Sequence, residues 1–313
     1  MSFTEIRHTG LRFSGVSALF EASRPHNALA AGLSTLVGAV VVAPSGSGVD
    51  THPALSALVA TGVVGSMLAV GAANLRNDAV DVWADRVNAP HRPLPRGAAS
   101  VRQAHVAAWL AMAGAAVCAV IVGLPVGAIG LLALAVSMAY SPYIKSTVLV
   151  GNAVVATISA LTVPFGAALA GGGTGHDWRR VWFVTLLLAL YIGAREVLKC
   201  LADEEGDRRA GAVTVVTAWG ATAAHRIVGA ASALLVLLII AAVPLFAPSV
   251  WRGAGFVLLC SVGAVLPLVL ARRTFEGTAR RPHDPARGAA LRLTKVGGFA
   301  LLVGALFLVP AAP

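Results

Sequence analysis

Acidic residues gather in two short stretches of the chain, which together hold eight of its 14 Asp and Glu residues. These are Asp78, Asp81 and Asp85 in the first stretch, and Glu196, Asp203, Glu204, Glu205 and Asp207 in the second. Each stretch contains two Asp residues four positions apart, and a helix places such a pair on one face. Because like charges in this arrangement repel each other, we expect a bound cation to offset them.

The residue types indicate which cation this would be. Asn77 stands four residues before Asp81 and adds an amide oxygen to the carboxylates of the first stretch. Oxygen donors without His or Cys favour Mg²⁺, which takes one or two carboxylates, keeps waters and shares substrate phosphates. Two acidic clusters that face each other therefore suggest a diphosphate held between them through magnesium ions.

The alternative is that the acidic residues only form ion pairs with arginines on a solvated loop. The neighbouring arginines are Arg86, Arg92, Arg208 and Arg209. We favour the metal site because both acidic stretches directly follow an apolar segment and are themselves followed by basic residues. Such an order, found twice, is typical of a shared role.

The elements that carry these residues lie in a membrane. The chain is 57% hydrophobic, and only 12% of its residues are charged, where a soluble domain has about twice that share. Crossing a bilayer takes roughly 20 apolar residues in a helix. We expect nine spans, near residues 27–44, 53–73, 103–122, 125–140, 148–171, 181–198, 227–247, 253–271 and 293–312.

Basic residues predict the orientation, because Lys and Arg are retained in cytoplasmic connections. With the N-terminus inside, 21 of the 24 Lys and Arg residues fall in inner segments, and only Arg179, Arg180 and Arg252 fall outside. We therefore expect a protein of the cell membrane whose N-terminus and acidic stretches face the cytoplasm. The excess of positive charge is explained by contact with anionic lipid headgroups, without a nucleic-acid partner.

Several motifs together resemble the UbiA superfamily of intramembrane prenyltransferases. The family's first motif, NxxxDxxxD, corresponds to Asn77, Asp81 and Asp85, with Asp78 as a frequent extra acid, and its second, DxxxD, to Asp203 and Asp207. Shorter matches are the RPxPxG stretch at 92–97, Arg24-Pro25-His26-Asn27, and the segment from Tyr140 through Lys145 to Asn152. The resemblance covers the chain from about residue 20 to 225, while the last three spans match only in number and hydrophobicity.

The resemblance implies an all-α integral membrane protein with nine transmembrane helices around a central cavity. No linker divides the chain, so we expect a single prenyltransferase-like domain over 1–313, with 1–23 as a cytoplasmic N-terminal segment. Its activity would be Mg²⁺-dependent ionisation of a polyprenyl diphosphate and transfer of the prenyl group to a lipophilic acceptor, either an aromatic compound or an alcohol.

Each site residue then receives an expected role. Four residues, expected to be catalytic, would hold Mg²⁺ with Asn77 and Asp78 in support: Asp81, Asp85, Asp203 and Asp207. The expected diphosphate-binding residues are Arg24, Asn77, Arg92, Lys145 and Lys199, although Arg and Lys at span ends can also anchor a helix at the interface. The Pro-rich segment 87–97 would form a lid over the diphosphate, with Arg92 and Arg96 contacting phosphate or acid groups.

Two other functions compete with prenyl transfer. A terpene cyclase of the same superfamily would ionise the same donor, but it commonly shelters carbocations against aromatic faces, and this chain is only 6% aromatic. A cation-coupled transporter would carry its acids near mid-membrane rather than at span ends.

One departure from the family pattern is Cys200, because several relatives carry Asp or Asn at that position.

Overall fold

The computed structural model describes residues 15–42, 53–140, 144, 147–171, 175–277 and 284–310, and within these ranges the chain is helical without strands. A helix over 15–22 precedes the others. The first half contains α2 (Pro25–Val42), α3 (Pro53–Val80), α4 (Val82–Asn88), α5 (Val101–Val122), α6 (Val126–Ala139), α7 (Val150–Ala160) and α8 (Thr162–Leu169). The second half contains α9 (Gly175–Ala202), α10 (Glu204–Arg209), α11 (Val215–Phe246), α12 (Val250–Cys260), the π-helical η3 (Ser261–Val265), α13 (Leu266–Gly277), α14 (Pro285–Ala305) and the short η4 (Leu306–Leu308).

The prediction of an all-helical integral membrane protein is confirmed. Eight helical segments among the described residues are long and apolar enough to cross a membrane. They coincide with eight of the nine expected spans. The remaining one, expected at 125–140, corresponds to α6, whose 14 residues fall short of the roughly 20 that a perpendicular crossing needs.

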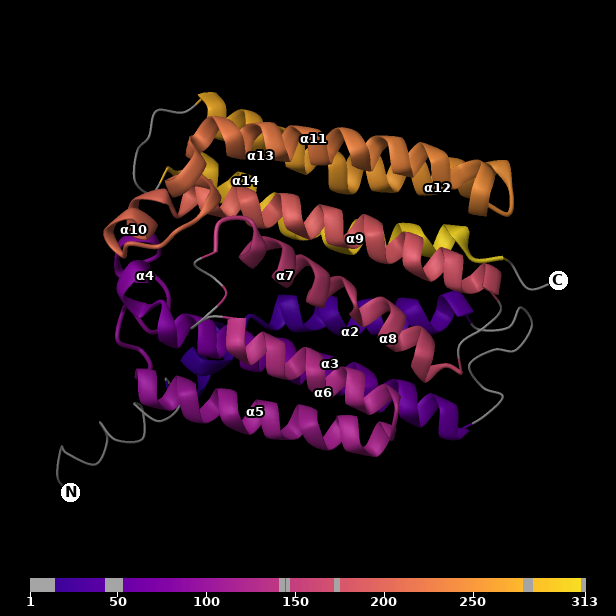
Figure 1. The fold of residues 1–313 in the computed structure, drawn as a ribbon, viewed down its shortest axis with the longest axis horizontal. Coiled ribbons are helices and arrows are strands. Elements are labelled where there is room, and N and C mark those ends of the chain that lie inside the picture. Colours follow the sequence, from indigo (N-terminus) through magenta and orange to yellow (C-terminus); the bar gives the residue numbers. More distant parts are fainter. Residues whose placement is uncertain are drawn as a thin grey trace, which may run out of the picture.

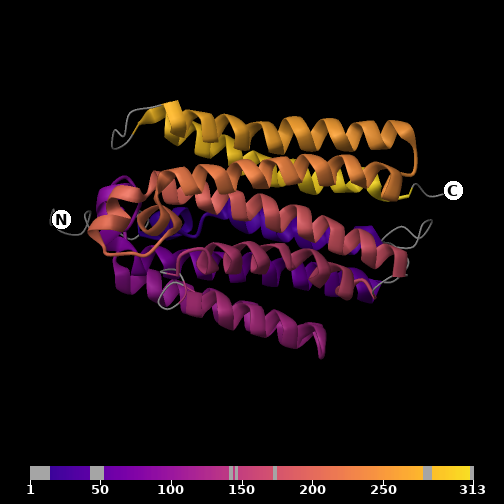
Figure 2. The same cartoon turned by 45° about the horizontal axis from the view of Figure 1, so that its top comes forward.

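The long helices run side by side along the longest axis of the molecule (Figures 1 and 2). In the first half, α3 packs against α5 and α2, while α2 also packs against α8. Helix α9 joins the two halves, since it contacts α7 on one side and α11 and α14 on the other. The last helix, α14, therefore lies next to α9 and also reaches α2.

Small residues allow the close helix crossing between α2 and α8. A Cβ atom at Gly38 would collide with the carbonyl of Val163, and one at Gly166 with the carbonyl of Thr35. Apolar side chains of α2, α8, α9 and α14 then meet in one buried cluster that includes Val37, Val163, Val181, Leu188 and Leu302. Such close packing of small residues is a common way for helices to associate in lipid.

Candidate active site

The two acidic motifs share one local backbone structure. Helix α3 ends at Val80 and α4 starts at Val82, with Asp81 between them, just as Asp203 separates α9 from α10. Asp81 has φ −86° and ψ 3°, and Asp203 has φ −93° and ψ 2°, so both occupy the bridge region of the backbone map. Figure 1 shows α4 and α10 next to each other at one end of the bundle, which we call the motif end.

The first motif is therefore not carried by one continuous helix. The helix is interrupted at Asp81 because the backbone there leaves the helical region. Hydrogen bonds nonetheless bracket the interruption, since Asp81 N donates to Asn77 O and Asp85 N donates to Asp81 O, both at 2.9 Å. Asp203 and Asp207 repeat this pattern, so the four-residue spacing of each motif is kept.

Asn88 joins the two motifs. Its side-chain Nδ2 donates a hydrogen bond to the carbonyl of Asp203 at 3.0 Å, and its Oδ1 accepts one from Gly206 N at 2.8 Å. A Cβ atom at Gly206 would overlap the Asn88 amide, so only glycine fits there without displacement. The end of α4 is thus fixed to the start of α10, which brings residues more than 100 positions apart into one site.

Tyr140 lies where both motifs can act on it. The charges of Asp81 from the first motif and Asp207 from the second both act on its hydroxyl, as does that of Glu196. Asp207 is itself buried, with 6% of its surface exposed. Residues of both motifs therefore lie near Tyr140.

Arg24 contacts the first motif from the start of α2. Its guanidinium forms an ion pair with Asp78, a carboxylate that is only 2% exposed. Arg24 has φ 54°, a left-handed conformation that is uncommon for residues other than glycine and that often occurs at functional sites. Asn74 holds this turn, because its Nδ2 donates to the carbonyl of Ser23 at 3.0 Å and its Oδ1 lies 3.4 Å from Arg24 Nη1.

Arg92, from the Pro-rich segment, also pairs with carboxylates of the first motif. Its Nη1 lies 2.7 Å from both carboxylate oxygens of Asp85 and 3.8 Å from Asp78. Burial lowers the pKa of this guanidinium, but the charges of Asp85, Asp78 and Asp203 outweigh burial and raise the pKa above its ordinary value. Arg92 is therefore a charged partner of the first motif, and it lies within range of the charge of Asp203.

Three predicted residues remain, namely Lys199, Arg96 and Lys145. Lys199 lies 2.7 Å from the buried carboxylate of Glu196, which also pairs with Arg195 at 3.3 Å. Arg96 pairs with Glu21 at 2.7 Å, away from both motifs. Lys145 falls outside the described residues.

The ion pairs of the alternative form at three of the acidic residues: Asp85 pairs with Arg92, as described above, and two residues of α10 pair within that helix. Glu204 pairs with Arg208 at 3.0 Å, and Glu205 pairs with Arg209 at 2.7 Å, in both cases within one turn of α10. The two pairs within α10 are partly or fully exposed, so they contribute little to stability.

The donor set fits magnesium that is bound together with a phosphate ligand. Among the described residues, no three His, Cys, Asp or Glu side chains converge to hold a metal ion by themselves. Arg24 and Arg92 instead neutralise the carboxylates of Asp78 and Asp85. Mg²⁺ needs only one or two protein carboxylates when substrate phosphates supply its other ligands. The carboxylate and amide oxygens of the two motifs are therefore suitable donors for this ion.

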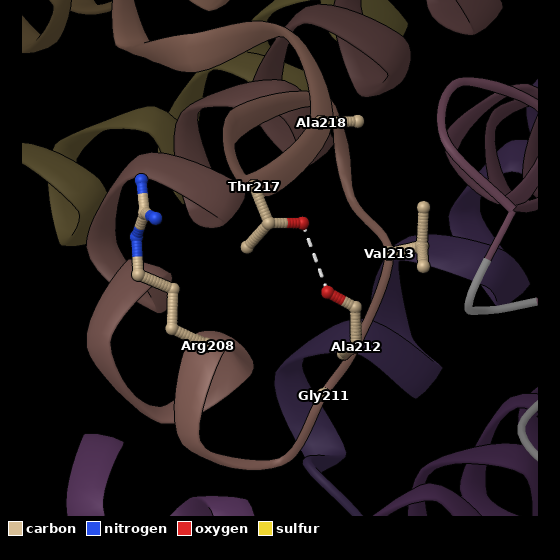
Figure 3. A pocket seen from close by; sticks show the side chains of 6 residues that line it. All are labelled: Arg208, Gly211, Ala212, Val213, Thr217 and Ala218. Atoms are coloured by element: carbon tan, nitrogen blue, oxygen red, sulfur yellow. Dashed lines mark hydrogen bonds between the residues drawn. The ribbon is translucent and has the colours of Figure 1, made fainter.

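A pocket beside the second motif is separate from this site. It is lined by Arg208, Gly211, Ala212, Val213, Thr217 and Ala218. Figure 3 shows the Thr217 hydroxyl donating a hydrogen bond to the carbonyl of Ala212, at 2.9 Å, which fixes the loop between α10 and α11. None of the predicted site residues lines this pocket.

An all-helical membrane bundle with two acidic motifs and arginines at one end is the architecture of an intramembrane prenyltransferase. The chain belongs to the UbiA prenyltransferase family, whose sequence model matches residues 31–309. The match extends through the last three helices, beyond the region that the motifs covered.

Known proteins resemble the chain over almost its whole length. It is 36% identical to digeranylgeranylglyceryl phosphate synthase from Halobacterium salinarum, over 93% of this chain and 96% of that protein. Its fold is similar to the apo structure of a UbiA homologue from Aeropyrum pernix K1, with a TM-score of 0.69, 18% identity, and 90% and 97% of the two chains covered. It is also similar to a UbiA homologue from Archaeoglobus fulgidus bound to GPP and Mg²⁺, with a TM-score of 0.62, 19% identity, and 91% and 99% covered.

Cys200 offers a test of the metal site. Its Sγ lies 3.5 Å from Asn152 Nδ2, one helical turn before Asp203. We expect Cys200→Asp to remain folded, because Asn152 can donate to the new carboxylate, and to lower the Mg²⁺ concentration for half-maximal activity severalfold. Cys200→Val, which adds no oxygen donor, should leave that concentration unchanged. An increased Mg²⁺ requirement in Cys200→Asp would contradict a metal next to this turn.

Proposed function

We propose that this prenyltransferase transfers a prenyl group from a polyprenyl diphosphate to the hydroxyl group of a prenylglyceryl phosphate. The observation that carries the proposal is the pair of acidic motifs joined by Asn88 and covered by Arg24 and Arg92. The choice of acceptor is supported by the 36% identity to a digeranylgeranylglyceryl phosphate synthase over nearly the full length of both chains.

The reaction needs a charged leaving group to be stabilised in a site that excludes water. The bond between the allylic carbon and the diphosphate oxygen breaks, and its electron pair leaves with pyrophosphate. The acceptor hydroxyl oxygen forms the new bond to that carbon, and its proton passes to the departing pyrophosphate. Stabilisation of charge that develops on a leaving group is commonly the largest contribution to such catalysis.

The residues of the chain divide this work between them. Arg24 and Arg92 would move from their carboxylate partners onto the diphosphate oxygens, where guanidinium groups bind in a bidentate manner. Magnesium, held by Asp81, Asp85, Asp203 and Asp207 with Asn77 and Asp78 in support, would neutralise the negative charge on those oxygens. The apolar helices keep water away from the allylic carbon.

The experiment is product analysis with purified protein in detergent. The donors are geranyl, farnesyl and geranylgeranyl diphosphate, each with Mg²⁺ or with EDTA, and the acceptors are a prenylglyceryl phosphate, an aromatic acceptor or none. We expect a Mg²⁺-dependent ether product with the glyceryl phosphate. Prenylation of the aromatic compound alone would overturn the acceptor class, and a cyclic product formed without acceptor would identify a cyclase instead.

A second prediction concerns the membrane side of the site. Ala210, after α10, lies at the motif end, and Gly175, at the start of α9, lies at the other end; both residues are exposed. In a chain without its three native cysteines, Ala210→Cys should resist a membrane-impermeant thiol reagent in intact cells, whereas Gly175→Cys should react. Both should react after the cells are permeabilised. The opposite pattern in intact cells would place the motif end outside.

A further inference from the structure

A second group of basic residues lies deeper in the bundle than the acidic motifs. It consists of Lys295 on α14 and Arg195 on α9, with His26 from the start of α2 nearby. Arg195 precedes Asp203 by eight residues, which corresponds to about 12 Å along a helix. Within the described part of the chain, Arg195 pairs with Glu196.

Helix periodicity places Lys295 on the face of α14 that packs inside the bundle. Residues seven apart share nearly the same helix face, so Lys295 faces the same side as Leu302. Leu302 is 1% exposed and packs with side chains of α2 and α9, including Val37 and Leu188. Lys295 is nevertheless exposed, so the face of α14 that is closed at Leu302 is open at the level of Lys295.

Contacts between α9 and α14 fix the positions of Lys295 and Arg195 along the bundle. The hydroxyl of Tyr191, one turn before Arg195, donates a hydrogen bond to the carbonyl of Thr294, which directly precedes Lys295. A Cβ atom at Gly297 would collide with that hydroxyl, so the small residue lets the two helices approach. Both cations therefore belong to one rigid contact between the two helices.

Positive charge exceeds negative charge around Lys295. The charges of Arg195, Arg24, Arg92 and Lys199 all act on Lys295. Among the described residues, no carboxylate forms an ion pair with Lys295. Glu196, the buried acid nearby, already accepts from both Arg195 and Lys199. Gathering cations in a low-dielectric region is unfavourable unless an anion offsets them.

Arg195 also has a buried N–H donor without a hydrogen-bond partner among the described residues. One of its terminal nitrogens lies 3.3 Å from Glu196, while its buried Nε has no hydrogen-bond partner among the described residues. A guanidinium offers five N–H donors in a planar fork, which suits a phosphate group. Together with the ammonium of Lys295, these donors would suit a doubly charged anion.

We propose that Lys295 and Arg195 bind the phosphate group of the acceptor, a role that rests on the proposed function. In a glyceryl phosphate the reacting hydroxyl is only a few bonds from phosphorus, so this phosphate must lie close to the donor diphosphate during transfer. Two such anions repel each other and need separate cations. The motif end supplies cations for the diphosphate, and the inner basic group supplies them for the acceptor.

The test compares Lys295→Gln with Lys295→Arg, and with Arg292→Gln as a control for an exposed basic residue on the same helix. Initial rates are measured in a detergent without phosphate groups, with the prenylglyceryl phosphate and with its dephosphorylated analogue. Binding of the phosphorylated acceptor alone is measured by calorimetry. Thermal unfolding confirms that each variant is folded.

We expect Lys295→Gln to raise the acceptor KM and Kd by about tenfold or more, since hydrogen bonds to charged groups are among the stronger ones. The donor KM should stay near that of the wild type, Lys295→Arg should recover most of the affinity, and Arg292→Gln should change nothing. The variant should also lose preference for the phosphorylated acceptor. An unchanged acceptor KM in Lys295→Gln, or a raised donor KM instead, would overturn the proposal. If the wild type fails to use the phosphorylated acceptor, the proposed function itself is wrong.

Discussion

Replacing Asp81 or Asp207 by Ala is expected to reduce kcat by about 10²–10³, the usual cost of removing one electrostatic contact at a developing charge. Each change removes a proposed magnesium ligand from one of the two motifs. Asp81 lies at the helix interruption before α4, and Asp207 is buried in α10. Turnover is measured at saturating Mg²⁺ and donor, with thermal unfolding to show that the variants remain folded.

Glu205 provides the matched control for this experiment. It lies on the same short helix as Asp207, is half exposed, and pairs with Arg209 at the surface. Glu205→Ala should therefore keep a wild-type kcat, because it removes a negative charge without touching the proposed ligands. Near-normal turnover in Asp81→Ala or Asp207→Ala would contradict the two-motif site, and so would an equal loss in Glu205→Ala.

Gly206→Ala should have the second large effect, although it adds only one methyl group. That methyl group would overlap the Asn88 amide, which must then move and lose its hydrogen bonds to Gly206 N and the Asp203 carbonyl. We expect kcat to fall by tenfold or more and the required Mg²⁺ concentration to rise, because the two motifs no longer keep their relative position. Asn88→Ala should reproduce both changes through loss of the same bonds.

The control for this change is another Gly→Ala substitution in a helix. Gly277 ends α13, and a Cβ atom there would meet nothing within 4 Å. Gly277→Ala should leave activity unchanged and should be neutral or slightly stabilising, since Ala is the better helix former. Wild-type activity in Gly206→Ala would show that the Asn88 connection does not position the motifs.

The spacing of acidic residues predicted much of the site, because helical periodicity is a local property. The four-residue repeats placed the Asp residues of each motif one turn apart, and the structure keeps that spacing through the hydrogen bonds of Asp85 and Asp207. The interruptions at Asp81 and Asp203 had no such signal, since neither motif contains proline at the break. Their backbone conformation depends on the packing of α4 against α10 instead.

Contacts between distant parts of the chain could not be predicted in the same way. In the sequence, nothing distinguishes Asn88 from an ordinary residue at the end of a helix. Its hydrogen bonds to α10 depend on how α4 is aligned with residues 115 positions further along the chain. Lys295 counted only as one of the basic residues near the last span. Its place in the bundle depends on the packing of α14 against α9 and α2.

The claim that both motifs hold one diphosphate is tested most directly by the binding of an unreactive prenyl thiodiphosphate, measured by calorimetry with and without Mg²⁺. We predict Mg²⁺-dependent binding by the wild type, and a loss of tenfold or more in Asp81→Asn and in Asp207→Asn. The double variant should lose less than the sum of the two, as expected for residues that act on one shared ligand. Mg²⁺-dependent binding that is unchanged in either single variant, or losses that simply add, would contradict a shared site.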